Sequence, residues 1–140
     1  MDIDMIGPAV VMGLGCIGSS IGCGIAGMAS HGVMTRVDEG HGKFIALSAI
    51  PSSQSIYGFI LMILMKGAIK GGSLTGIAGI GIGLFVGLAI MVSAILQGKC
   101  AVTAIQAAAK QPAIYGKTIV ALGIVESFAL FAFVFALLLI

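Results

Sequence analysis

The sequence predicts an all-α membrane protein with four transmembrane helices, arranged as two tandem copies of one helical hairpin. The first observation is the composition: of 140 residues, 59% are hydrophobic and 9% are charged, with a mean hydropathy of +1.21. A soluble domain carries roughly 25% charged residues. The second observation is that four stretches of membrane-spanning length contain almost no charge. The third is that the chain matches itself at a shift of 74 residues.

The composition also excludes several classes of protein. Such a hydrophobic chain is not intrinsically disordered, and it has no basic cluster for binding nucleic acid. Its three cysteines, Cys16, Cys23 and Cys100, lie in apolar stretches. Their number is odd and no CxxC or Cys/His spacing occurs, so we predict neither a disulfide framework nor a zinc site.

The first element is predicted as a helix over about residues 5–35, because Met5 to Thr35 contains no Asp, Glu, Lys or Arg. About 20 apolar residues cross a bilayer as a helix. A secretory signal peptide would begin with Lys or Arg and would be shorter, whereas Asp2 and Asp4 precede this stretch. We therefore expect the first span to be retained in the mature protein.

Three further helices follow from the same reasoning, since residues 44–65, 71–98 and 118–140 carry no charge except Glu126. Short polar segments separate these stretches. The chain is therefore predicted to consist of a first hairpin, a connecting loop and a second hairpin, over residues 1–66, 67–75 and 76–140. The helices after the first are expected at about residues 43–66, 76–109 and 113–140.

The basic residues near the helix ends predict the orientation in the membrane, because cytoplasmic loops carry an excess of Lys and Arg. Lys66 and Lys70 belong to the second connection. Five basic residues belong to the first and third connections: Arg36, Lys43, Lys99, Lys110 and Lys117. We therefore expect the first and third loops in the cytoplasm, with the 67–75 loop and both termini on the other side.

The internal repeat explains the two hairpins. At a shift of 74 residues, the segment from 13 to 64 has eleven identities without a gap, and Gly42-Lys43 falls on Gly116-Lys117. The repeat runs in parallel, so one hairpin has been duplicated without inversion. Glu126 falls opposite Ser52, so only the second hairpin carries the acid.

Glycines are concentrated in the first and third predicted helices. Gly13 to Gly18 reads GxGxxG, but a dinucleotide site needs a strand before this motif, and none is predicted here. Small residues about three or four apart let membrane helices approach closely. Two such helices at equivalent repeat positions suggest the inner wall of a ring of copies. The predicted ring-packing residues are Gly13, Gly15, Gly18, Gly22, Gly79, Gly81, Gly83 and Gly87.

The second and fourth predicted helices carry bulky side chains instead, and these are expected to face lipid. They are Phe59, Ile60, Leu61, Met62, Leu64, Phe128, Phe131, Phe133 and Phe135.

Glu126 is the candidate functional residue. No other charged residue lies between Lys117 and the end of the sequence. A carboxylate at mid-membrane costs roughly 2.5–3.5 kcal/mol on insertion scales, and such residues usually mark ion or proton pathways. The structural alternative is a protonated Glu that hydrogen-bonds a neighbouring helix.

Other polar residues are predicted to reach Glu126. Ile50, Ser53, Gln54 and Tyr57 share one face of a helix, and Pro51 should kink that helix. Glu126 is 9 residues from Lys117, Gln54 is 11 from Lys43, and Gln97 is 13 from Lys110. At 1.5 Å per residue these side chains lie at about 14, 17 and 20 Å from the cytoplasmic anchors.

This set offers about five oxygen ligands, which suits a hard, partly dehydrated cation. The ligands would be a carboxylate, two amide oxygens, a hydroxyl and a backbone carbonyl. A proton site would need only the carboxyl group and one acceptor, and each Gln taken alone could simply bond two helices together.

Three segments carry a resemblance to a known family: Pro51-Ser-Ser-Gln-Ser-Ile-Tyr-Gly-Phe59, Leu96-Gln-Gly-Lys99 and Val125-Glu-Ser-Phe128. They resemble the proteolipid (subunit K, or c) of V-type and A-type rotary ATPases, especially the bacterial V-type ones. The resemblance covers essentially the whole chain, including the duplicated hairpin and the loss of the acid from the first hairpin.

The resemblance implies a ring of identical subunits that rotates in the membrane and carries Na⁺ or H⁺ on Glu126, coupled to ATP hydrolysis or synthesis. In sodium-transporting members the ion is held at positions matching Glu126, Gln97, Gln54, Ser53 and the backbone carbonyl of Ile50. Tyr57 matches the residue that bonds the Glu. Ser53 stands where those members often have Thr, which preserves the hydroxyl group.

The resemblance also implies the partners and the setting. A membrane stator subunit would supply an Arg, lipid would surround the ring, and a central-stalk subunit would approach the cytoplasmic loops near Arg36, Asp38 and Glu39. The protein would not be catalytic itself, would need no organic cofactor and would bind no nucleic acid. A bacterial plasma membrane is the expected location.

Two other functions compete with this interpretation. A small four-helix proton- or sodium-coupled transporter would also need an acid, but it would more often carry Trp, which is absent here, and inverted halves. A channel or structural oligomer would explain the glycines but would leave Glu126, Gln97 and Gln54 without a role.

Overall fold

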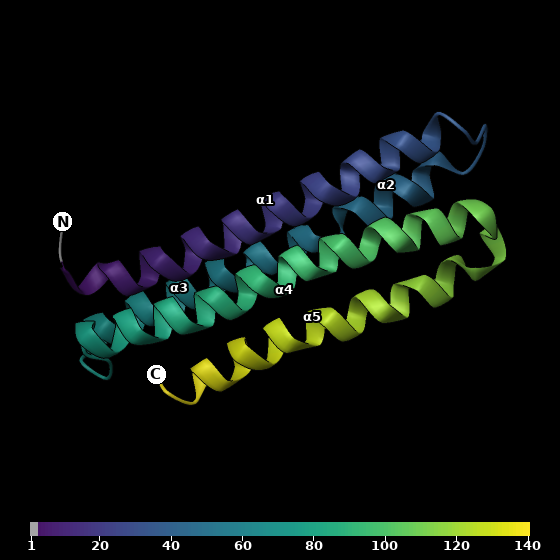
Figure 1. Cartoon of the computed structure of the whole chain (residues 1–140). Helices are drawn as coiled ribbons and strands as arrows, with labels where there is room; N and C mark the ends of the chain where they lie inside the picture. The colour runs from purple at the N-terminus through teal and green to yellow at the C-terminus, as the bar shows by residue number, and fades with distance from the viewer. Residues whose placement is uncertain (1–2) are drawn as a thin grey trace.

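The chain folds into four long, roughly antiparallel helical rods (Figure 1). The structure is a computed structural model that describes residues 3–140, and within this range it contains no strand. The α-helices are α1 (Ile6–Met34), α2 (His41–Ala49), α3 (Ser53–Gly71), α4 (Gly76–Lys110) and α5 (Tyr115–Leu137). Short 3₁₀ turns lie at Ile3–Met5, Ile50–Ser52 and Pro112–Ile114.

The four rods are long and apolar enough to cross a membrane. They are Ile3–Met34, His41–Gly71, Gly76–Lys110 and Pro112–Leu137, so α2 and α3 together form one rod. The start of α1 and the end of α5 lie at the same end of the bundle as the α3–α4 connection, and the other two connections lie at the opposite end (Figure 1). The prediction of an all-α protein with two membrane hairpins is therefore confirmed.

The second rod is longer than the predicted helix over 43–66. It begins at His41 and continues through Lys66 and Lys70 to Gly71, which leaves only residues 72–75 for the connection. Lysine is a good helix former, and its long side chain can reach water from a helix end. The helix ends where Gly72 adopts a left-handed conformation (φ 77°), which costs glycine little.

Pro51 interrupts the second rod, as its fixed ring predicts. Residues Ile50–Ser52 form a 3₁₀ turn between α2 and α3, with the Pro51 side chain buried. The turn also lets side chains bond the backbone: Ser52 Oγ donates to the Ala49 carbonyl at 2.7 Å, and Ser53 Oγ donates to the Ile50 carbonyl at 3.0 Å. The interruption therefore brings the Ile50 carbonyl and the Ser53 hydroxyl together.

Glycines let α1 and α4 approach closely at the centre of the bundle. A Cβ atom at Gly18 would lie 2.6 Å from Met91 Cα, and one at Gly22 would collide with the Ala94 carbonyl. Of the eight predicted ring-packing glycines, six are buried in contacts within the chain: Gly15, Gly18, Gly22, Gly79, Gly83 and Gly87. Apart from the adjacent backbone of its own helix, a Cβ at Gly13 or Gly81 would meet no atom of residues 3–140 within 4 Å.

The bulky side chains of α3 and α5 do not all face outward. Phe59, Phe128 and Phe135 are exposed, as expected for a lipid-facing surface. Leu61 is instead fully buried, because it lies on the face of α3 that packs into the core. Phe133 is half-buried and packs on Tyr57, with the ring centroids 5.9 Å apart.

Candidate ion-binding site

The carboxylate of Glu126 on α5 is held by hydrogen bonds from two other helices. Its Oε1 accepts from Ser53 Oγ at 2.5 Å and from the Tyr57 hydroxyl at 2.9 Å, both on α3. Its Oε2 accepts from Gln97 Nε2 on α4 at 3.3 Å. Ser53 and Tyr57 are four residues apart, so the helical period puts both donors on the same face of α3. Three neutral donors thus fix the position of the one acid in the second hairpin.

Two fully buried glutamines lie beside the Glu126 carboxylate and bond to each other. Gln54 and Gln97 are both 0% exposed, and Gln54 Nε2 donates to Gln97 Oε1 at 3.0 Å. Gln97 Nε2 also donates to the Leu122 carbonyl at 3.1 Å. Because Gln97 contacts α3 and α5 at once, it links the two outer helices of the chain through α4.

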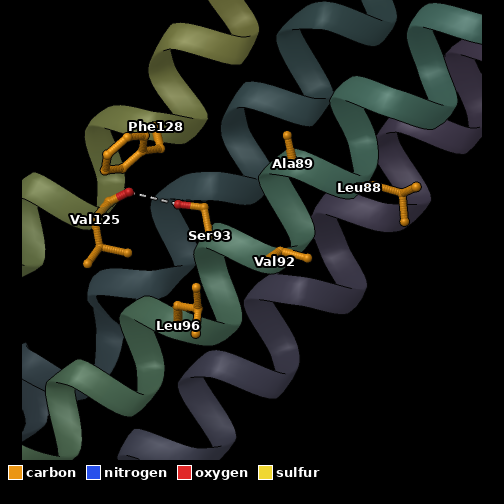
Figure 2. Close-up of a pocket in the computed structure, with 7 residues that line it drawn as sticks. All are labelled: Leu88, Ala89, Val92, Ser93, Leu96, Val125 and Phe128. Atoms are coloured by element: carbon orange, nitrogen blue, oxygen red, sulfur yellow. Dashed lines mark hydrogen bonds between the residues drawn. The ribbon is translucent and has the colours of Figure 1, made fainter.

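Ser93 belongs to the same network and was not predicted from the sequence. Its hydroxyl accepts from Gln54 Nε2 at 3.1 Å and donates to the Val125 carbonyl at 2.9 Å, a bond drawn in Figure 2. The signals that could have revealed it are its spacing, four residues before Gln97 on one face of the helix, and its identity with Ser19 in the repeat. A single serine in a glycine-rich helix does not by itself predict a binding site, because its hydroxyl group can hydrogen-bond to the backbone of its own helix.

Gln54 Oε1 is the unusual atom of the site. It is buried and has no hydrogen-bond partner among residues 3–140. Leaving a buried acceptor unpaired costs about 1–3 kcal/mol, and such a group calls for an explanation. Gln54 Nε2 donates to both Ser93 and Gln97. The Gln54 oxygen therefore stays free to accept a hydrogen bond or to bind a cation.

All six predicted site residues lie in one connected hydrogen-bond network. Ile50 contributes its carbonyl, Ser53 its hydroxyl and Gln54 its amide nitrogen, and these join Tyr57, Gln97 and Glu126. The network draws on the second, third and fourth rods, whereas α1 contributes no hydrogen bond to it within the described residues. The available ligand atoms are oxygens, which suit hard cations such as Na⁺.

The residues present do not resemble a transition-metal site. Within residues 3–140 there is no group of three or more His, Cys, Asp or Glu side chains that could hold a metal ion. Zinc and other soft or borderline metals prefer nitrogen and sulfur ligands. The oxygen atoms around Glu126 are ligands of the kind that hard cations prefer, and a carboxyl group can also carry a proton.

Comparison with known proteins identifies the family. A family model that describes the C-subunit of ATP synthase matches residues 6–65 and again residues 80–139. The chain belongs to the ATP synthase C-subunit family. The two matches begin 74 residues apart, which is the shift of the internal repeat, so each hairpin corresponds to one copy of the family's unit.

Two curated relatives narrow the resemblance within this family. The chain is 34% identical over 134 residues to the A-type ATP synthase subunit K of Methanocaldococcus jannaschii, covering 96% of this chain and 60% of that protein. It is also 34% identical over 128 residues to the V-type sodium ATPase subunit K of Enterococcus hirae, covering 89% of this chain and 81% of the relative. The predicted resemblance to V-type and A-type proteolipids is confirmed, and it makes the chain a non-catalytic membrane subunit of an ion-translocating ATPase.

Proposed function

We propose that the chain is the rotor-ring subunit of a V-type rotary ATPase and carries one Na⁺ ion on Glu126. The arrangement of ligands around this residue is the observation that supports the proposal. An anionic carboxylate in the membrane needs a neutralising partner, yet its three hydrogen-bond donors are all neutral. A bound cation or a proton would supply the missing charge.

The free oxygen of Gln54 favours Na⁺ over H⁺ as the cargo. A protonated Glu126 needs one acceptor only, so it would leave the buried oxygen of Gln54 without a partner. A sodium ion would use the carboxylate, the Ser53 hydroxyl, the Gln54 and Gln97 amide oxygens and the Ile50 carbonyl, with Tyr57 holding the carboxylate in place. One relative is itself named a sodium ATPase subunit.

Rotation follows from the charge of the site. A loaded site is electrically neutral and can face lipid, whereas an empty one carries an uncompensated carboxylate. Identical copies would form the ring, and an Arg of a membrane stator subunit would displace the ion as each Glu126 passes it. Moving one charge across 100 mV takes about 2.3 kcal/mol, so several copies must act for each ATP.

The orientation and the remaining partners belong to the same proposal. The first and third connections would face the cytoplasm of a bacterial cell, and both termini would lie outside the plasma membrane. Arg36, Asp38 and Glu39 are exposed in the first connection, where they are accessible to a central-stalk subunit.

Carbodiimide labelling of the purified ring tests the cargo. Carbodiimides modify a protonated carboxyl group, so bound Na⁺ should protect Glu126. At fixed pH we expect mass spectrometry to locate the label on Glu126, and labelling to slow when Na⁺ replaces K⁺ at equal ionic strength. Equal rates in both salts would contradict Na⁺ and leave H⁺ as the cargo.

The rotor role has its own test in the assembled ATPase. Glu126→Gln keeps the size of the side chain but removes its charge, so ATP-driven ion transport into vesicles should be abolished. Asp4→Asn also exchanges an acid for its amide, but Asp4 lies in the Ile3–Met5 turn, outside the hydrogen-bond network of Glu126; this variant is the matched control and should transport normally. Transport that survives Glu126→Gln would refute the rotor role of this residue.

A further inference from the structure

We propose that Phe133 is a positioning residue of the ion site, because its ring holds the Tyr57 side chain where the hydroxyl can donate to Glu126. The two rings pack with their centroids 5.9 Å apart and an interplanar angle of 35°. The Tyr57 hydroxyl lies 2.9 Å from Glu126 Oε1. This inference rests on the proposed function, since it gives Phe133 a part in holding Na⁺ at Glu126.

The three donors to Glu126 differ in what holds them in place. Ser53 Oγ also donates to a backbone carbonyl of its own rod at 3.0 Å, and Gln97 Nε2 also donates to a backbone carbonyl of α5 at 3.1 Å. The Tyr57 hydroxyl, by contrast, forms no other hydrogen bond among residues 3–140. The position of this third donor therefore depends on how its ring is packed.

The packing of the Tyr57 ring is not ensured by burial alone. Tyr57 is half-buried, and a tyrosine side chain can turn about two bonds, so rotation would carry the hydroxyl away from the carboxylate. Tyr57 and Phe133 both pack against one apolar cluster, which includes the fully buried Leu61 and Ala129. Within residues 3–140, Phe133 is the aromatic ring that packs on Tyr57. It is therefore the neighbour that can restrict this rotation.

Helical spacing places Phe133 where it can support a ring that reaches Glu126. Glu126, Ala129, Phe133 and Ala136 are three or four residues apart, so they share one face of α5. Both alanines are buried, which shows that this face packs into the bundle. Glu126 and Phe133 are two turns apart, about 10 Å along the helix axis. Because Ala129 between them has no side chain beyond Cβ, a tyrosine ring can reach both.

The aromatic pair lies on one side of the carboxylate. Phe133 follows Glu126 toward the end of α5, and Tyr57 follows Ser53 toward the end of α3. Both rings therefore lie toward the end of the bundle that holds the α3–α4 connection (Figure 1). Glu126 Oε1 accepts from Ser53 and Tyr57 only, among residues 3–140. If the Tyr57 ring turned away, this oxygen would keep a single donor.

The internal repeat supplies a matched residue for comparison. Phe59 lies 74 positions before Phe133, at the equivalent point of the first hairpin. It is nevertheless 46% exposed, and it packs on no other aromatic ring among residues 3–140. Its place in the hairpin therefore does not explain why Phe133 packs on Tyr57. Phe59→Leu removes the same ring from an equivalent depth in the membrane and should leave the site unchanged.

Carbodiimide protection tests the role of Phe133 at the ion site. Phe133→Leu should raise the Na⁺ concentration that half-protects Glu126 about 2- to 10-fold, the effect expected for the loss of one aromatic pair. Phe59→Leu should leave this concentration unchanged, and Phe133→Tyr, which keeps the ring, should restore protection.

A second background separates positioning from general stability. Tyr57→Phe has no hydroxyl to orient, so adding Phe133→Leu to it should cause no further rise in the protecting concentration. An equal rise in both backgrounds would show that Phe133 acts through the stability of the chain, and would overturn the proposal.

A measurement on Tyr57 itself, made without Na⁺, separates this inference from the proposed function. The chain has two tyrosines and no Trp, so in a Tyr115→Phe background the tyrosine bands of a Raman spectrum come from Tyr57 alone. These bands report the hydrogen bonding of the phenol. Phe133→Leu should shift them toward the spectrum of Glu126→Ala, in which the hydroxyl has lost its acceptor, whereas Phe59→Leu should not.

The outcomes bear on the two proposals differently. Tyrosine bands that stay unchanged in Phe133→Leu would overturn the positioning role, even if Na⁺ protects Glu126. Bands that shift in a protein whose labelling is not slowed by Na⁺ would support the positioning role and contradict Na⁺ as the cargo.

Discussion

At the scale of single residues, the proposed ligands at Glu126 differ in their hydrogen bonds from the residues that hold them in place. Gln54 and Gln97 are the same residue type and equally buried, yet only Gln54 has an oxygen without a partner among residues 3–140. The difference arises because Ser93 and Gln97 both accept from Gln54 Nε2. Tyr57 acts differently again, since a phenol that donates to Glu126 fixes the carboxylate without adding charge.

Gln54→Leu should weaken sodium binding while keeping the bulk of the side chain. Removing one ligand or hydrogen bond to a charged group costs about 1.5–3 kcal/mol, so the Na⁺ concentration that half-protects Glu126 from carbodiimide should rise about 10- to 100-fold. Labelling without Na⁺ should be retained. Gln106→Leu, at an exposed position of α4, is the control, and equal protection in both variants would exclude Gln54 as a ligand.

Ser93→Ala should have a smaller effect of the same sign, because Ser93 holds the Gln54 amide in place and is not itself a predicted ligand. Losing one neutral hydrogen bond costs about 0.5–1.5 kcal/mol, which corresponds to a 2- to 10-fold rise in the same protecting concentration. Ser93→Thr retains the hydroxyl and should partly restore protection. A loss as large as that of Gln54→Leu would indicate direct ligation instead.

At the scale of secondary structure, glycines and Pro51 determine how the rods meet. The turn at Ile50–Ser52 brings a backbone carbonyl and a hydroxyl to the site, while α1 lies close against α4 wherever glycines remove the side chain. Leu61 and Met65 fill the space between these elements as buried core residues. The site therefore lies on rods whose spacing is fixed by residues that are not ligands.

Gly22→Ala should destabilise the chain, because the new Cβ would collide with the Ala94 carbonyl and lie 2.9 Å from Pro51 Cβ. Overpacking of this kind typically costs about 1–3 kcal/mol, although Ala favours a helix over Gly by roughly 1 kcal/mol. We expect a lower Tm by circular dichroism in detergent. Gly32→Ala, in open space on the same helix, should leave the Tm unchanged or raise it, and similar shifts for both variants would refute the packing argument.

At the scale of the whole molecule, much of the structure could be predicted from the sequence. The four rods follow from the charge-free stretches, and the site follows from helical spacing combined with depth, because helices fix how far apart residues lie along the membrane normal. The end of α3 was misplaced because lysines were interpreted as a boundary. Ser93 was missed because periodicity cannot show which neighbour a hydroxyl contacts.

The glycines show a second limit on sequence-based prediction. Helical spacing indicates that a glycine face packs closely, but it cannot indicate whether the partner is the same chain or another copy. The structure separates Gly18 and Gly22, buried against α4, from Gly13 and Gly24, which have open space in the chain. Only the three-dimensional contacts show that the glycines of α1 form two groups, one buried within the chain and one with open space around it.

Gly24→Leu should disrupt the proposed ring without unfolding the chain, because Gly24 is exposed on α1 with open space around it, so that a leucine there would clash with a neighbouring copy and not with the chain itself. We expect smaller species on native gels, with helix content unchanged by circular dichroism. The control is Gly67→Leu, since Gly67 is equally free of contacts within residues 3–140 and follows Ile60 and Ile63 along an exposed face of α3. An intact ring in Gly24→Leu would contradict a contact between copies at this face of α1.

The bonds that hold α5 also determine how freely it can move. Among residues 3–140, every hydrogen bond from another rod to α5 ends on Leu122, Val125 or Glu126, within little more than one helical turn. The rest of α5 meets its neighbours through apolar contacts and through the Tyr115 ring, whose centroid lies 5.6 Å from Lys43 Nζ, and these contacts are less directional than hydrogen bonds. A cation at Glu126 would strengthen the attachment of residues 122–126 to the other rods, and its release would weaken this attachment. We therefore expect α5 to rotate more freely about its own axis when the ion leaves Glu126. Ion binding and the rotation of α5 would then be two effects of the same equilibrium.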